Sequence, residues 1–237
     1  LPARFYIKEV AKQRSPFKRL QIWQTTTHKK TGKRFDERLY IQVPGKVRLE
    51  RRRQGKLVQV DLWKGQQWLQ WRQGQQTVRK RRRPQVRFDF FAIEPAGYGY
   101  GGLSSLLAKL GVRYIGVQKY DRDSDYLEPL RVSLAWFQRG PAVVLGAPTN
   151  DRRSQQFWID KKTFIPLRFI GRTKQKGGRV DVRFLDYHKK AGRSVFPGRI
   201  DVFRNGKLVI QSLVSRVKVR RSFPSSLFRP IQKKNSP

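Results

Sequence analysis

From residue 17 onward, apolar and polar positions alternate with a period of two along most of the chain. Leu39 and Ile41 lie on one side of such a segment, with Tyr40 between them, and residues 180–184 repeat the pattern. This alternation predicts antiparallel strands with one buried face and one wet face. Turn residues such as Pro44-Gly45 interrupt the pattern about every ten residues, which predicts a meander of hairpins.

Two stretches depart from this period. Residues 3–13 have the spacing of a short amphipathic helix, which Ser15-Pro16 should end because the residue before proline disfavours the helical region. Residues 85–110 carry leucines at i, i+3, i+4 and i+7, the stripe of a second helix, with Gly111 suited to its C-terminal cap. That stripe fits a lid over a cavity and equally fits an ordinary helix packed on a sheet. Its members are Leu103, Leu106, Leu107 and Leu110.

Composition adds a strong charge to this picture. The 237 residues include 54 Lys and Arg against 16 Asp and Glu, a formal net charge of +38. Such a charge predicts anionic partners: phospholipid, lipopolysaccharide or nucleic acid. With 38% hydrophobic residues the chain can still bury a sizeable core. The first residue is Leu1, which fits a chain cleaved after a signal peptide and also fits a chain trimmed on expression.

Catalytic and metal-binding patterns are weak. The chain has no cysteine, and its two histidines, His28 and His188, lack the spacing of metal ligands. The acidic segment 121–125 lacks the glycine and the final glutamate of a calcium loop. No nucleophile elbow is present either. We therefore expect a binding protein with no metal and no cofactor, and not an enzyme.

Three groups of motifs resemble the LolA-like outer-membrane lipoprotein-sorting family, which includes LolB-like and RseB-like domains. The first is the early hairpin series that ends in the turn Lys64-Gly65 and Trp68, and the second is the pair of strands around residues 157–169. The third is the late series over residues 183–228. Its positions, with those of the strand pair, are Trp158, Ile159, Asp160, Thr163, Pro166, Leu167, Phe184, Asp186, Tyr187, Pro197, Ile200, Pro224, Leu227 and Phe228.

The resemblance implies a mainly β fold with a few helices. We expect a half-open, incomplete antiparallel barrel of about eleven strands, with an N-terminal helix and a central helical lid, as in that family. Residues 1–228 would form one such domain with the helical insert 85–110, and residues 229–237 would be a disordered tail. One position departs from the family pattern. The carrier has an arginine that holds the lid before the strand-ending proline, but Val43 precedes Pro44 here, which implies a different latch or a more open cavity.

The resemblance also implies candidate binding residues. Apolar inward faces would line a cavity for acyl chains: Leu20, Ile22, Leu39, Ile41, Val58, Val60, Leu62, Leu167, Phe169, Val182 and Phe184. The lid would carry Phe88 and Phe91 together with the four leucines of the stripe. Two basic runs would contact anionic headgroups or the membrane surface: Arg51, Arg52 and Arg53, and Arg79, Lys80, Arg81, Arg82 and Arg83.

The function implied is a monomeric periplasmic carrier, secreted by means of a cleaved signal peptide. It would carry lipoprotein acyl chains, or anionic lipid or lipopolysaccharide, and contact the membrane peripherally. An inner-membrane release complex and an outer-membrane acceptor would be its partners. Two alternatives stay open at this point. One is a periplasmic sensor or structural module on the same fold, and the other is a cationic nucleic-acid-binding protein, whose aromatic residues could stack bases.

Overall fold

The computed structural model describes thirteen ranges of the chain. They are 3–13, 18–43, 45–64, 67–74, 79–81, 102–108, 110–113, 132–138, 140–147, 151, 154–172, 178–191 and 194–229. The predicted first helix is confirmed as α1 (Ala3–Gln13), and residues 102–108 form a second helix inside the predicted insert.

Strands dominate the fold, as predicted. In chain order they are β1 (Arg19–His28), β2 (Arg34–Gln42), β3 (Lys46–Arg53), β4 (Lys56–Lys64), β5 (Gln67–Arg72), β6 (Arg79–Arg81), β7 (Val132–Phe137), β8 (Gly140–Leu145), β9 (Gln156–Asp160), β10 (Pro166–Arg172), β11 (Arg179–Ala191), β12 (Ser194–Arg204) and β13 (Lys207–Val219). A short 3-10 helix, η2 (Ser225–Phe228), follows them. The described residues thus contain thirteen strands, in agreement with the prediction of about eleven, and one of the thirteen is the short basic strand at residues 79–81.

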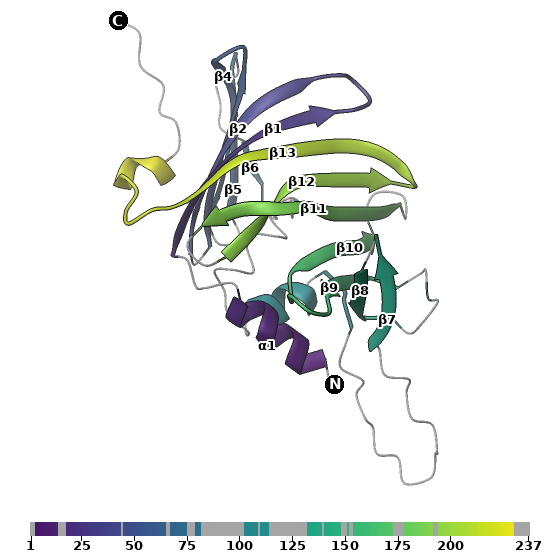
Figure 1. Cartoon of the computed structure of the whole chain (residues 1–237). Helices are drawn as coiled ribbons and strands as arrows, with labels where there is room; N and C mark the ends of the chain where they lie inside the picture. Colours follow the sequence, from purple (N-terminus) through teal and green to yellow (C-terminus); the bar gives the residue numbers. More distant parts are fainter. Residues whose placement is uncertain are drawn as a thin grey trace, which may run out of the picture.

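All thirteen strands belong to one antiparallel sheet, in the order β6-β5-β4-β3-β2-β1-β13-β12-β11-β10-β9-β8-β7. The first and last strands therefore pair in the middle. Among the described strands, β6 and β7 lie at the two edges and do not pair with each other, so the sheet is open. Figure 1 shows the sheet curling so that β8–β10 turn beneath β11–β13, with α1 beside them. The half-open antiparallel barrel is thereby confirmed.

The core lies on the concave face, which we call the inner face. One cluster of buried side chains joins Ile7 and Val10 of α1, Leu103 and Leu107 of helix 102–108, and the inward positions of the strands. Phe5 and Tyr6 of α1 also contact Phe164, which precedes β10. Both helices are thus held by burial of their apolar stripes against the sheet.

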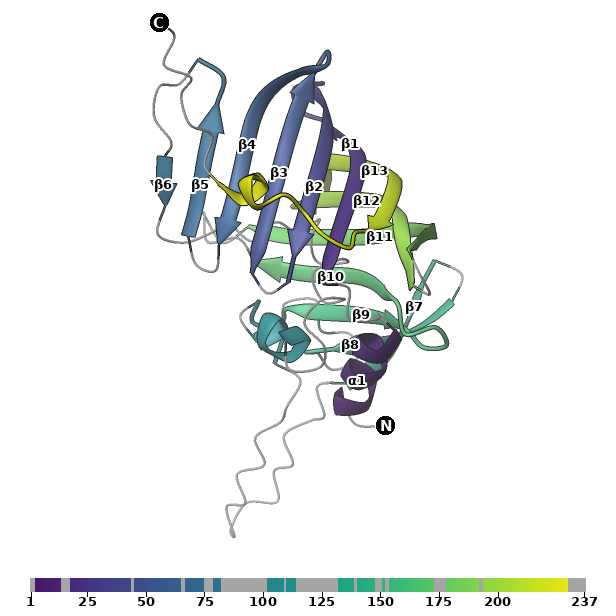
Figure 2. The ribbon, with the colours of Figure 1, turned by 90° about the vertical axis from the view of Figure 1, so that its left-hand side faces the viewer.

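The convex, outer face is covered in part by the C-terminal arm, residues 220–229. Figure 2 shows this arm crossing outside β1 and β2, with η2 beyond them, and η2 contacts β3. The Phe223 ring lies 5.8 Å from Tyr40 and 5.9 Å from Phe228, both edge-to-face. Arg48 also donates to the carbonyl oxygen of Leu227 at 2.9 Å. The outer face of β2 and β3 is therefore partly buried too.

Candidate functional site

An apolar floor occupies part of the inner face. Seven of the residues predicted to line a cavity lie there, each at most 3% exposed and all in the core cluster: Leu20, Ile22, Leu39, Ile41, Phe169, Val182 and Phe184. Register explains their grouping, because Leu20 pairs with Ile41, and Ile22 with Leu39. In this structure the two helices pack in the same cluster. Such burial fits a closed cavity lining and an ordinary core equally, so the cavity role stays a prediction.

The prediction placed the wrong residues of β4 on the inner face. Leu39 pairs with Leu49, and Leu49 pairs with Asp61, so Asp61 and Trp63 share the inner face. Val60 and Leu62 point to the outer face, and Val58 lies at a register shift between β3 and β4. Val60 and Leu62 are apolar because the outer face of this region is itself buried, at 4% and 2% exposure. Leu167 is half-buried at a second register shift.

Helix 102–108 presents the predicted leucine stripe to the core. Leu103 and Leu107 are fully buried, and Leu106 and Leu110 are partly buried against the same cluster. The other predicted lid residues, Phe88 and Phe91, lie outside the described residues.

A polar belt continues the floor along the same strands, and the sequence prediction missed it. Its centre is Arg51, whose Nε lies 2.7 Å from Glu37 Oε1 and whose guanidinium lies 3.5 Å from Asp61 Oδ2. The side chains of Glu37 and Asp61 are 0% and 4% exposed. Buried carboxylates of this kind require paired cations and hydrogen bonds, because desolvation disfavours their charge.

Neutral donors complete the belt on both sides of this trio. Glu37 Oε2 accepts from Gln24 Nε2 and Thr26 Oγ1, each at 2.7 Å, and Thr26 is 2.8 Å from Ser212 Oγ. On β4 and β5, Asp61 accepts hydrogen bonds from Gln59 (2.6 Å), Gln70 (2.7 Å) and the Trp68 indole (3.1 Å). The belt thus runs across β13, β1, β2, β3, β4 and β5.

Two tryptophans lie where floor and belt meet. The rings of Trp63 and Trp68 stack with centroids 6.1 Å apart and an interplanar angle of 3°. Both are buried in the core cluster, and the Trp68 indole also donates to Asp61. A sequence signal for the belt did exist: Gln24, Glu37 and Asp61 continue the period-two pattern of the neighbouring apolar residues.

The predicted headgroup residues are dispersed. Arg51 faces inward and is ion-paired with Glu37 and Asp61, so its contact with a headgroup at the surface stays a prediction. Arg52 lies on the outer face, 3.4 Å from Glu50, and Arg53 is exposed. Arg79, Lys80 and Arg81 form β6 against β5, and Arg82 and Arg83 lie outside the described residues.

The outer face carries an ion-pair cluster of its own. Arg168 makes two 2.7 Å hydrogen bonds to Asp181, and Arg183 lies 3.1 Å from the same carboxylate. Burial alone would raise the pKa of Asp181, but the hydrogen bonds and charge of Arg168, with those of Arg183, outweigh it and lower this pKa below its usual value. Asp181 is therefore ionised and held in place at neutral pH.

Within the part of the chain that the structure describes, no three His, Cys, Asp or Glu side chains come together as a metal site. Nor does any described helix have the length and apolar character needed to cross a membrane.

The chain was compared with known proteins in sequence and in structure, and only its structure is similar to theirs. No family model matches the chain, and no curated protein matches it in sequence. Among solved structures, the chain is similar to a LolA superfamily protein, NE2245, from Nitrosomonas europaea, with a TM-score of 0.58, 13% identity and coverage of 97% of this chain and 98% of that one. The chain is also similar to a putative outer membrane lipoprotein-sorting protein domain from Vibrio parahaemolyticus, with a TM-score of 0.59, 12% identity and coverage of 94% of each chain.

A DUF1329 family protein from Desulfovibrio piger gives a TM-score of 0.57 and 11% identity, with 96% of this chain and 97% of that one covered. These similarities extend over nearly the whole chain. The protein has a LolA-like fold.

Proposed function

We propose that this protein is a periplasmic carrier that holds acyl chains of lipoproteins or other lipids on its inner face for transfer toward the outer membrane. The observation that carries the proposal is the division of one inner face into an apolar floor and a polar belt. The fold supports it, because one structural relative is described as a lipoprotein-sorting domain. We further propose that the chain acts without enzymatic activity.

An acylated ligand is amphiphilic. The apolar floor suits its acyl chain, and the polar belt suits its polar linkage. Each buried methylene contributes about 0.8 kcal/mol, so a single acyl chain on the floor would provide roughly 10 kcal/mol before ordering costs are subtracted. The ester or amide groups of the ligand need hydrogen-bond partners, which the belt can offer through its glutamines and carboxylates. Trp63 and Trp68 lie at the boundary, where the chain would meet its linkage.

Uptake would require the helices to leave the floor. Leu103 and Leu107 occupy the same cluster as Leu39 and Phe184, so an acyl chain would replace these leucines. We therefore retain the predicted lid role for helix 102–108. The exchange is close to balanced in free energy, because one apolar contact replaces another, and that balance suits a carrier that must also release its ligand.

The charge of the chain supports contact with anionic membranes. Each Lys or Arg near such a surface contributes about 1 kcal/mol, and this attraction decays within a Debye length of about 8–10 Å. We propose peripheral contact with anionic lipid or lipopolysaccharide by a monomer that receives its cargo from an inner-membrane release complex and delivers it to an outer-membrane acceptor.

A sensor or structural module is the second candidate, and one observation favours it. The edge strand β7 pairs with β8 alone among the described strands, and its Leu134 and Trp136 are 57% and 75% exposed. An exposed strand edge with apolar side chains suits the addition of a peptide strand. Under this candidate the β7 edge would bind a peptide, or the inner face would bind a lipid-bearing ligand, as a signal.

Native mass spectrometry of protein purified from the periplasm tests the carrier proposal, since a carrier should retain lipid. A second test uses brominated fatty acids, because bromine quenches an indole only on contact. We expect quenching that the double variant Trp63→Phe/Trp68→Phe largely loses and that Trp23→Phe retains, because Trp23 pairs with Arg216 and Arg38 on the outer face.

The absence of both co-purified lipid and quenching would reject the carrier. A peptide that binds and is lost on substitution of Trp136 would then favour the sensor, and a salt-sensitive complex with DNA but none with lipid would favour nucleic-acid binding.

A further inference from the structure

A cleft of about 510 Å³ lies between the tips of two hairpins, far along the strands from the two helices. One wall is the β1–β2 turn and the start of β2, and the other is the end of β3 and its turn. The cross-strand pair Asp36 and Arg52 joins the walls at the base. Its charged lining consists of Lys33, Arg34, Asp36, Arg52 and Arg53.

The cleft is strongly positive. Four cations face a single carboxylate, a formal charge of +3, and Asp36 already accepts a hydrogen bond from the Thr25 hydroxyl at 3.1 Å. Arg34 and Arg53 are exposed. A concave site lined by one sign of charge concentrates its field and attracts an anion of opposite sign.

One arginine of the cleft is held in position. The guanidinium of Arg52 lies 3.4 Å from Glu50 Oε2 and 3.4 Å from the Gly55 carbonyl oxygen. Its Nε is buried and has no hydrogen-bond partner among the described residues. A planar guanidinium fixed in this way loses little freedom when it binds an oxyanion.

The turns that form the walls are also fixed. Gly32, Gln54 and Gly55 adopt positive φ angles of 63°, 50° and 75°, the backbone that tight hairpin turns demand. The β1–β2 turn is closed by a hydrogen bond from the His28 amide to the Lys33 carbonyl at 2.9 Å. The cleft is therefore built into the backbone and does not depend on long side chains alone.

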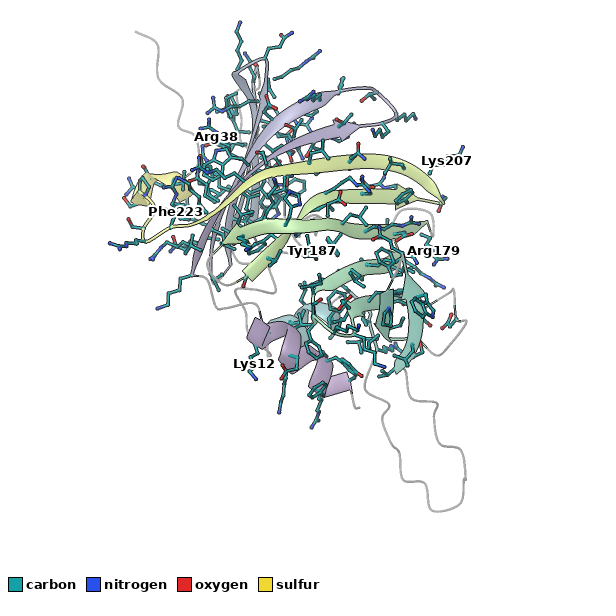
Figure 3. All side chains as sticks on the ribbon, viewed as in Figure 1. Lys12, Arg38, Arg179, Tyr187, Lys207 and Phe223 are labelled. Carbon is teal, nitrogen blue, oxygen red and sulfur yellow. The ribbon has the colours of Figure 1, made fainter. Side chains whose placement is uncertain are left out.

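More cations surround the cleft at the same end of the sheet. Pairing of β13 with β1 brings the β12–β13 turn beside the β1–β2 turn, and Figure 3 shows Lys207 at the tip of that hairpin. The turn segments 29–34, 53–56 and 204–207 contain no acidic residue. Their exposed cations outside the cleft are Lys29, Lys30, Lys56, Arg204 and Lys207.

We infer that this cleft binds a phosphate group carried by a small polar alcohol, such as a glycerol or sugar phosphate. Its volume falls within the range of about 300–1,000 Å³ that is typical of small-ligand sites and exceeds the need of a bare phosphate. The source is either an anionic lipid headgroup or a soluble phosphate ester. This site lies apart from the floor, and the inference holds whether or not the inner face carries lipid.

Isothermal titration of the full chain with glycerol 3-phosphate, at physiological salt, tests the site. The cleft variant is Arg34→Gln/Arg53→Gln, which removes two exposed charges and no side-chain hydrogen bond to any described residue. The matched control is Lys56→Gln/Arg204→Gln, which removes two exposed charges from the adjoining turns. We expect the cleft variant to weaken binding at least tenfold and the control to weaken it less than twofold. Equal weakening by both, or no binding by the unmodified protein, would overturn the inference.

Vesicles of phosphatidylglycerol, with phosphatidylcholine vesicles as the reference, identify the source of the phosphate. If a lipid headgroup is the ligand, the cleft variant should lose more vesicle binding than the control does. If a soluble ester is the ligand, the two variants should bind vesicles equally while only the cleft variant loses glycerol 3-phosphate. Thermal melting of both variants confirms that each is folded. None of these readouts requires acyl-chain carriage, so the failure of one proposal leaves the other testable.

Discussion

Two ion-pair clusters lie on opposite faces of the sheet and have opposite compositions. On the inner face, Arg51 lies between Glu37 and Asp61, a formal charge of −1. On the outer face, Asp181 lies between Arg168 and Arg183, a formal charge of +1.

Exposure explains the difference between the clusters. The inner carboxylates are at most 4% exposed, whereas the side chain of Arg183 is 38% exposed. A surplus positive charge is tolerated outside because water solvates it. The surplus carboxylate inside has little water and is offset by neutral hydrogen-bond donors, which are Gln24, Thr26, Gln59, Gln70 and the Trp68 indole. The chain thus keeps much of its excess of cations on the outer face and at the strand ends, and leaves the inner face close to neutral.

Removal of Arg51, the arginine of the inner cluster, should cause the largest loss in the free energy of unfolding. Arg51→Met would leave two buried carboxylates without their cation, so we expect the free energy of unfolding to fall by about 3–5 kcal/mol. The control is Arg53→Met, two residues along the same strand but exposed, which should change stability by less than about 0.5 kcal/mol. Urea denaturation measures both, and similar small losses would show that the inner cluster does not need its charge balance.

A substitution where the floor meets the belt should lower the free energy of unfolding by an intermediate amount. Trp68→Phe keeps most of the apolar ring but removes the indole hydrogen bond to a charged acceptor, so we expect a loss of about 1.5–3 kcal/mol. Circular dichroism should also lose the coupled signal of the stacked Trp63–Trp68 pair. The control Trp136→Phe, on an exposed side chain, should preserve both properties. A stable Trp68→Phe variant would mean that Asp61 is satisfied by Arg51 and its two glutamines without the indole.

Substitution of Asp181 in the outer cluster should have the smallest effect on the free energy of unfolding, and this effect should depend on acid pH. The pKa of Asp181 is lowered by its arginines, so its stabilisation is fully present above the ordinary aspartate pKa of about 3.9 and is lost as the pH falls through the lower folded value. Between about pH 5 and pH 2 we expect the unmodified protein to lose on the order of 1 kcal/mol more than Asp181→Asn does. Parallel pH profiles would contradict this assignment.

Local sequence patterns determined most of the elements of this fold. The period-two alternation predicted the strands, the leucine stripe predicted helix 102–108, and turn residues such as Gln54-Gly55 marked the hairpins. These signals are readable because they depend on residues close in the chain. The shared order of the family motifs then predicted an open half-barrel, as the structure shows.

Only the tertiary structure decided which face of each strand became the inner one. In β4, both faces are buried, because the helices and core lie on one side and the C-terminal arm partly covers the other side of the sheet. Hydrophobicity alone therefore could not distinguish Val60 and Leu62 from Trp63. The same ambiguity hid the polar belt, since Glu37 and Asp61 look like wet positions until their partners from other strands are known.

The arginine run 51–53 shows most directly what the sequence determines and what the tertiary structure decides. The sequence determines that three positive charges follow one another, but strand geometry sends Arg51 to the inner face and Arg52 to the outer one. Arg52 meets near neighbours, Glu50 and the Gly55 carbonyl, but the partners of Arg51 are Glu37 and Asp61 of other strands. Those neighbours are brought together by strand pairing, whose non-local contacts form only when the chain folds.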